Sequence, residues 1–193
     1  MEIRVQDLAK SYGGVTVLSG VTFTARPGVL RIVGASGAGK TTLLRLILGL
    51  ETPDRGTIRG TDGLRWGAVF QEDRLLERLD AAGNLRFVLG RDYDGEAARE
   101  VLAALGLAHA GNRPAGTFSG GMKRRLALAR ALLAPGGGLL LDEPFAGLDG
   151  ENRRRAVSCI RRWGAGKVIL LAAHSREDGL EGAVLTLENG RPV

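Results

Sequence analysis

The chain has 193 residues, of which 44% are hydrophobic and 25% charged, with a formal net charge of +6. This length suits one domain with a substantial core, and no apolar run approaches the ~18 residues of a membrane span or forms the core of a secretion signal. The arginines are spread along the chain rather than gathered in one stripe, which argues against a nucleic-acid-binding face.

The first part of the chain predicts strands, then a glycine-rich loop and a helix. Residues 2–6, 21–25 and 29–33 have the β-branched and alternating character of strands. The stretch "GASGAGKTTLLRLILGL" follows, with leucines at helical spacing after the glycines. Residues 51–60 predict a turn, and "RWGAVF" predicts a strand that ends at Gln71.

The second part predicts helices first and apolar strands later. Residues 72–118 have a helical pattern, and a further helix follows Ser119. "GGLLLDEP" and "KVILLAAH" are short apolar strands, separated by a helix from about 150 to 163 in which Cys159 is expected to be a packing residue. "AVLTLENGRPV" predicts two short strands around an Asn-Gly turn.

Apolar strands that alternate with helices predict an α/β fold with a parallel core sheet, into which residues 72–118 are inserted as helices. Four polar residues directly follow predicted strands: Gln71, Asp142, Glu143 and His174. Open α/β sheets bind ligands at the carboxyl ends of their strands. We therefore expect these four side chains to share one site.

The stretch from Gly34 to Thr41 matches G-x-x-x-x-G-K-[ST] between a predicted strand and a predicted helix. Its glycines let the backbone wrap a polyphosphate, Lys40 can reach the β- and γ-phosphates, and the Thr41 hydroxyl can bind Mg²⁺. Asp142 is placed to hold the same metal ion, and Glu143 beside it is a candidate general base for water.

The stretch "FSGGMKRR" raises a different question. Ser119 is a favoured helix N-cap, but the glycines that follow it add nothing to capping. Gly120 and Gly121 leave backbone N–H groups bare at the positive end of a helix, as an anion site requires. The pattern predicts both a cap and a phosphate contact.

With these motifs in order, the chain resembles the ATP-binding-cassette (ABC) ATPases over nearly its whole length. In this resemblance "FSGGM" is the signature, "LLLDEP" the Walker B motif, and "AGLD", which ends at Asp149, the D-loop. Tyr12 would stack on adenine, Gln71 would touch Mg²⁺ and sense a transmembrane partner, and His174 would contact the γ-phosphate. The Walker A motif would contribute Gly34, Ala35, Ser36, Gly37, Ala38, Gly39, Lys40, Thr41 and Thr42 to the binding of ATP.

The resemblance implies a single P-loop ABC domain over residues 1–193, with a mostly parallel core sheet, an N-terminal antiparallel β part and a helical subdomain. The RecA-like core would comprise residues 1–71 and 134–193, and the helical subdomain about 72–133. Two cassettes would meet head to tail, so that Ser119, Gly120 and Gly121 contact ATP held by the partner. Met122 and Ala146 depart from the family's usual glutamine and serine.

The region "VFQEDRLLERLDAAGNL" is similar to importers of the nitrate/sulfonate/taurine type, in which residues 72–91 would receive a coupling helix of the permease. The chain would then be cytoplasmic, held at the inner face of the membrane by permease subunits, without direct membrane insertion or nucleic acid. Because the chain ends soon after its last hairpin, no C-terminal regulatory domain is expected. An exporter cassette and a soluble iron–sulfur-assembly ATPase remain alternatives, whereas a P-loop kinase or GTPase lacks the signature and the Q-loop.

Overall fold

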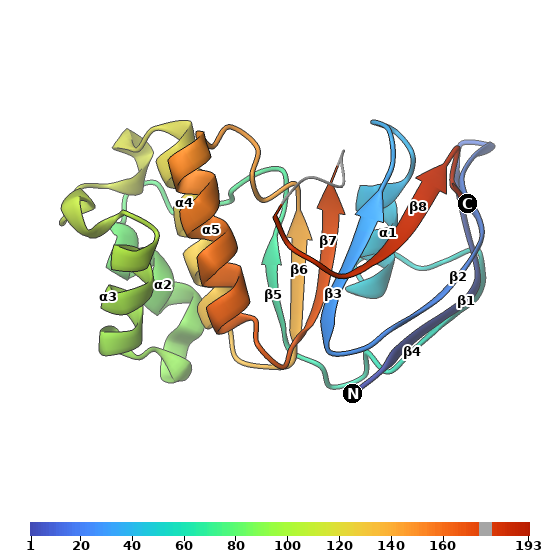
Figure 1. Ribbon diagram of the computed structural model, residues 1–193, viewed down its shortest axis with the longest axis horizontal. Coiled ribbons are helices and arrows are strands. Elements are labelled where there is room, and N and C mark those ends of the chain that lie inside the picture. The colour runs from blue at the N-terminus through green and yellow to red at the C-terminus, as the bar shows by residue number, and fades with distance from the viewer. Residues whose placement is uncertain (174–178) are drawn as a thin grey trace.

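The structure is a computed structural model that describes residues 1–173 and 179–193. Its central sheet has the strand order β5-β6-β7-β3-β8-β9. The first five strands in this order pair in parallel, and β9 pairs antiparallel to β8. The carboxyl ends of the parallel strands lie at one edge (Figure 1). The strands are β3 (Gly28–Val33), β5 (Trp66–Val69), β6 (Gly138–Asp142), β7 (Val168–Ala173), β8 (Ala183–Glu188) and β9 (Arg191–Pro192).

A second, antiparallel sheet has the order β2-β1-β4, formed by β1 (Ile3–Tyr12), β2 (Val15–Ala25) and β4 (Arg55–Arg59). The first two strands are longer than predicted, because Gly13 and Gly14 (φ 54° and 84°) close a continuous hairpin. The prediction of a turn over residues 51–60 was wrong at its end. There β4 pairs with β1, and its mostly exposed side chains gave no apolar signal.

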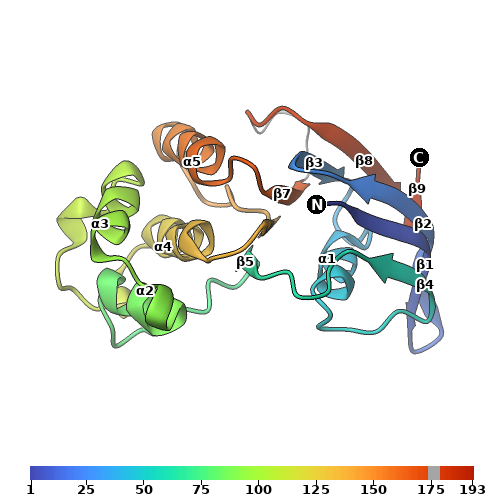
Figure 2. The same cartoon turned by 90° about the horizontal axis from the view of Figure 1, so that it is seen from below.

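The described residues form five α-helices: α1 (Lys40–Ile47), α2 (Ala81–Leu89), α3 (Gly95–Ala104), α4 (Gly120–Leu133) and α5 (Gly150–Trp163). Helix α1 lies between the two sheets, whereas α4 and α5 lie on the other side of the central sheet, with α2 and α3 beyond them (Figures 1 and 2). The helical prediction for residues 72–118 holds only in part, because 72–80 contain no helix.

The central sheet separates two apolar cores, and β7 contributes alternate residues to each. Ile169 and Leu171 belong to the core with α2–α5, whereas Leu170 belongs to the core around α1. A fully buried Leu or Ile contributes about 1.5–3 kcal/mol, so the sheet is fixed from both sides and holds its edge loops in place. Cys159 is a buried packing residue of the first core, and burial raises the pKa of its thiol to about 11.

Candidate nucleotide-binding site

The glycine-rich loop joins the carboxyl end of β3 to the start of α1 (Figure 1). A Cβ atom at Gly34 would lie 2.4 Å from the Leu187 carbonyl oxygen of β8. At Gly39, whose φ is 93°, a Cβ atom would lie 2.6 Å from Leu18 Cδ2. Only glycine fits at these two positions, and the loop thereby holds its backbone N–H groups at the positive end of a helix.

Lys40, the first residue of α1, is folded over this loop. Its side chain is buried, and Nζ donates hydrogen bonds to the carbonyl oxygens of Gly34 (2.8 Å) and Ala35 (2.9 Å). A phosphate oxygen carries more negative charge than a carbonyl oxygen, so it would be the better partner for this ammonium group. The lysine is thus held beside the loop in position to meet an anion.

A pocket of about 190 Å³ opens beside the loop and brings several predicted residues together. Its walls are formed by P-loop residues, by Gln71 after β5 and by Glu143 after β6, together with Val17 of β2, which the sequence did not single out. The complete lining is Val17, Ser36, Gly37, Gly39, Lys40, Thr41, Thr42, Gln71 and Glu143.

Asp142 ends β6 with a side chain that is only 1% exposed. Its Oδ2 accepts a 2.7 Å hydrogen bond from the Thr41 hydroxyl, and its buried Oδ1 has no hydrogen-bond partner in the described part of the chain. Burial raises the pKa of this carboxyl, and the Thr41 hydrogen bond opposes that rise. A buried carboxylate oxygen without a partner, next to a hydroxyl, fits a hard cation such as Mg²⁺.

Glu143 has a backbone conformation that is unusual for a residue with a side chain. Its φ is 50°, its amide donates to the Ala172 carbonyl (3.0 Å), and its own carbonyl accepts from Ala146 N (3.1 Å). Such a conformation costs roughly 1–3 kcal/mol and is typical of functional sites. Here the strained turn brings the carboxylate to the pocket wall, beside Lys40 and Gln71.

Tyr12 stands at the end of β1 with an exposed ring, 44% accessible to solvent. Its hydroxyl donates to the carboxylate of Glu51, and the Lys10 ammonium lies 5.4 Å from the ring centroid. Desolvation, reinforced by Glu51, raises the pKa of Tyr12, and a side-chain hydrogen bond with Thr42 opposes the rise. The ring therefore stands beside the last P-loop residue, and Glu51 is a neighbour that sequence reasoning missed.

The signature residues do not line the pocket around Lys40. Ser119 caps α4 by accepting from Met122 N (3.3 Å). A Cβ atom at Gly120 would meet nothing within 4 Å, and one at Gly121 would meet only Gly147 O (3.5 Å) and Leu148 Cδ2 (3.7 Å). Nothing within the described chain therefore requires glycine at either position.

Asp149 also lies outside this pocket. It caps α5 by accepting from Asn152 N at 2.8 Å, and this backbone hydrogen bond is the main cause of its lowered pKa. The structure therefore groups the P-loop, Gln71 and Glu143, with Asp142 behind them, and leaves the signature and D-loop residues elsewhere. His174 falls outside the described residues, so its role stays a prediction.

Comparison with known proteins agrees with this geometry. Residues 18–146 match the family described as ABC transporter. The chain belongs to this family. The cassette is 40% identical over 200 residues to the aliphatic sulfonates import ATP-binding protein SsuB of Granulibacter bethesdensis, covering 98% of this chain and 81% of that protein. It is 36% identical to the sulfate/thiosulfate import ATP-binding protein CysA of Xanthomonas campestris, covering 99% of this chain and 62% of that protein.

Solved structures of ABC cassettes share the fold of the whole chain. An ATP-binding subunit of an ABC transporter superimposes with a TM-score of 0.86 at 29% identity, covering 100% of this chain and 88% of that one. The dimeric cassette MJ0796, in a post-hydrolysis state bound to ADP and Pi, gives a TM-score of 0.87 at 25% identity, covering 98% and 96%. The protein is thus an ATP-hydrolysing ABC cassette with the predicted α/β fold.

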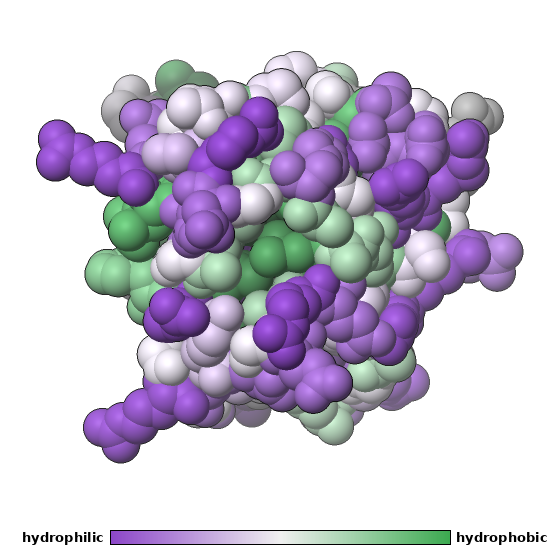
Figure 3. Space-filling model, turned by 90° about the vertical axis from the view of Figure 1, so that its left-hand side faces the viewer, coloured by the Kyte–Doolittle hydropathy of each residue, from purple (hydrophilic) through white to green (hydrophobic). Residues whose placement is uncertain are grey.

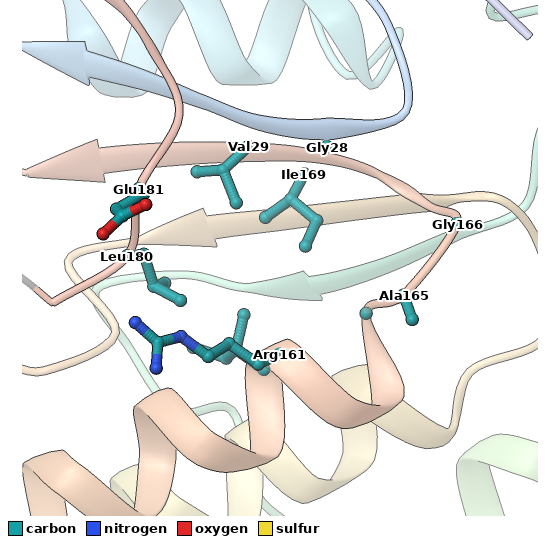
Figure 4. Close-up of a pocket in the computed structure, with 10 residues that line it drawn as sticks. Gly28, Val29, Arg161, Ala165, Gly166, Ile169, Leu180 and Glu181 are labelled. Atoms are coloured by element: carbon teal, nitrogen blue, oxygen red, sulfur yellow. The ribbon is translucent and has the colours of Figure 1, made fainter.

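A larger cavity of the cassette, about 320 Å³, lies away from the P-loop between α5 and the first residues of β3 and β7. Figure 4 shows Val29, Ile169 and Leu180 along it, with the charged ends of Arg161 and Glu181 near Leu180. It has no phosphate-binding loop, and its walls are mainly aliphatic side chains and glycines. This cavity therefore offers few groups that could bind a polyphosphate, in contrast to the pocket around Lys40.

Lys40→Ala should weaken the binding of ATP about 10- to 100-fold, because a charge-assisted hydrogen bond contributes roughly 1.5–3 kcal/mol. Equilibrium binding of a fluorescent ATP analogue measures the effect. Arg26→Ala is the matched control, because this surface cation pairs only with Glu2 among the ion pairs of the described residues. Equal affinity of the Lys40 variant and the wild type would contradict the P-loop assignment.

Asp142→Asn should raise the melting temperature of the nucleotide-free cassette by about 2–4 °C for each kcal/mol gained by removing a buried charge whose Oδ1 has no hydrogen-bond partner in the described chain. The difference in melting temperature from the wild type should shrink as the pH is lowered, because burial raises the pKa of Asp142 above that of an ordinary aspartate and the wild-type carboxyl is then neutralised earlier in the titration. The same variant should lose the additional rise in melting temperature that Mg²⁺ gives to the ATP-bound cassette. Thermal unfolding with ATP, in Mg²⁺ or in EDTA, checks both effects.

Proposed function

We propose that this cassette binds Mg²⁺-ATP, pairs head to tail with a second cassette and hydrolyses the nucleotide to drive an importer. The observation that carries the proposal is the division of the motifs. Lys40, Gln71 and Glu143 line one pocket, whereas the signature glycines lie outside it, where the described chain would admit a Cβ atom at either position. An anion held by a second cassette would explain why those positions are glycine.

In this mechanism, Lys40 and the loop N–H groups bind the phosphates, and the ring of Tyr12 stacks on the adenine of ATP. Glu143 orients a water molecule and accepts its proton as the oxygen attacks the γ-phosphorus. Thr41, Asp142 and Gln71 would hold Mg²⁺, which supplies charge neutralisation to the phosphates when it is bound. His174, and Ser119 and Gly121 of the second cassette, would stabilise the γ-phosphate, and Asp149 would lie at the contact between the cassettes.

A surface for the permease is expected over residues 72–91. The end of the molecule at α2 and α3 has apolar side chains gathered among charged ones (Figure 3). Four large apolar residues of this region are exposed: Leu76, Leu79, Phe87 and Val88. None of the described helices is long and apolar enough to cross a membrane. We therefore propose peripheral attachment at the cytoplasmic face, through permease subunits that receive this surface.

The relatives named above import sulfonates or sulfate and thiosulfate, which favours import of a small sulfur oxyanion over the exporter and iron–sulfur alternatives. The test is uptake of labelled ethanesulfonate and sulfate by cells that lack the gene. Wild-type cassette should restore uptake of one of them, and Glu143→Gln should not. Restoration of neither by the wild type would overturn the substrate class, and restoration by the variant would overturn the coupling to hydrolysis.

A further inference from the structure

Helix α4 holds the segment that carries Gln71 through a buried arginine. Arg124 is 7% exposed, and its guanidinium donates to the Phe70 carbonyl and, at 2.8 Å, to the Gln71 carbonyl. The same group lies 3.2 Å from Asp73 Oδ1. One side chain thus donates hydrogen bonds to two consecutive carbonyls, in the planar fork geometry that only arginine offers, and forms an ion pair with a carboxylate of this segment.

A second arginine of α4 extends this attachment. Arg130 donates to the Arg74 carbonyl at 2.7 Å and to the Asp73 carbonyl at 2.9 Å. Burial raises the pKa of Asp73, and the charges of Arg124 and then Arg130 oppose that rise. Together the two arginines tie the backbone of residues 70–74 to the helix. Hydrogen bonds thus connect α4 to the backbone of Gln71 and of the residues that flank it.

The N-terminus of the same helix carries the signature residues. Ser119 caps α4, and Arg124 lies little more than one turn after it. An α-helix transmits a displacement over this distance as a rigid body, because its backbone hydrogen bonds keep successive turns in register. Gln71, at the far end of the connection, lines the pocket of this cassette's own nucleotide.

We propose that Arg124 is a positioning residue that couples the signature motif to Gln71, so that closure on the partner's ATP sets Gln71 in this cassette's own site. The inference rests on the proposed function, because it requires a second cassette at Ser119–Gly121. Each site of the dimer then becomes competent only when the other holds ATP, which makes hydrolysis cooperative. Arg124 touches no nucleotide in this role and acts through the backbone of Gln71.

The experiment compares Arg124→Met, Arg124→Lys and the control Arg162→Met, which removes a cation that α5 pairs with Glu100 of α3 at the surface. Steady-state ATP hydrolysis gives kcat and the Hill coefficient, binding of a fluorescent ATP analogue gives the affinity, and thermal unfolding reports on the fold. Arg124→Met should lower kcat at least tenfold and move the Hill coefficient from near its ceiling of about 2 toward about 1. Its ATP affinity should stay within about twofold of wild type, because no pocket residue is altered.

Arg124→Lys should fall between the wild type and Arg124→Met, since a lysine keeps the charge near Asp73 but lacks the fork that holds two carbonyls. If Arg124→Met does not fold, Asp73→Asn takes its place. That variant leaves both backbone hydrogen bonds of Arg124 available, and it should show the same loss of cooperativity in smaller measure. In Arg162→Met, kcat and the Hill coefficient should match the wild type.

A melting temperature that falls in Arg124→Met while kcat and the Hill coefficient stay unchanged would overturn the proposal, because Arg124 would then be structural only. Gln71→Ala separates this failure from a failure of the proposed function. If Gln71→Ala lowers kcat and Arg124→Met does not, the coupling alone is wrong. If Gln71→Ala itself has no effect, the proposed role of Gln71 fails and the coupling fails with it.

Discussion

Glu143→Gln is expected to lower the rate of ATP hydrolysis about 10²- to 10⁴-fold, the range that a positioned general base contributes. Glutamine keeps the size of the side chain and can still orient water, but it cannot accept the proton. ATP affinity should persist, because Lys40 and the loop N–H groups are unaltered. The bound ATP should then hold two cassettes together, and gel filtration in ATP should give a dimer where ADP gives a monomer.

Glu100→Gln is the matched control, because it makes the same chemical change on α3, where Glu100 pairs with Arg162 at the surface. This variant should hydrolyse ATP at the wild-type rate and show no dimer that outlasts hydrolysis. Wild-type turnover by Glu143→Gln would instead assign the base to another group. If Glu143→Gln hydrolyses slowly but stays monomeric in ATP, the assignment of Glu143 as the general base stands and the ATP-held dimer is contradicted.

The chemistry of the pocket could be predicted from the sequence because each group follows a strand. Parallel strands end at a common edge, so Gln71 after β5 and Glu143 after β6 had to meet the loop that follows β3. The Thr41–Asp142 hydrogen bond, across 101 residues of sequence, follows from the same rule. The central sheet could be predicted equally well, since strands buried on both faces produce continuous apolar runs in the sequence.

The remaining features depend on contacts that leave no periodic signal. Backbone hydrogen bonds to β1 make β4 an edge strand, and four of its five residues are exposed, so the sequence looks like a turn. The contact between Tyr12 and Glu51 joins positions far apart in the sequence. Arg124 was indistinguishable from the other arginines of a basic helix until its burial against Gln71 was visible.

Gly120→Asp should abolish ATP hydrolysis without weakening the fold of the cassette. Its new Cβ atom would meet nothing within 4 Å in its own chain. A carboxylate in the first turn of α4 also interacts favourably with the helix dipole, so the melting temperature should stay equal or rise slightly. Against a partner's triphosphate, however, the new carboxylate is a like charge. At a separation of about 4 Å and an effective dielectric constant of 20, the two repel by roughly 4 kcal/mol, which lowers the affinity of the signature for the partner's ATP about 10³-fold.

The decisive measurement mixes Gly120→Asp with Lys40→Ala, two variants that should each be nearly inactive alone. In the mixed dimer, one site combines the intact Lys40 of the first variant with the intact signature of the second, while the other site carries both defects. Equal amounts should therefore give mixed dimers that ATP holds together, because half of the dimers are mixed and each has one intact site. Hydrolysis should stay below about a quarter of the wild-type rate, because the second site holds no ATP to set Gln71 of the first. A mixture in which ATP adds no mixed dimer detectable by cross-linking would contradict the contribution of the signature in trans. Activity of Gly120→Asp alone at the wild-type rate would mean that the glycines face no anion at all.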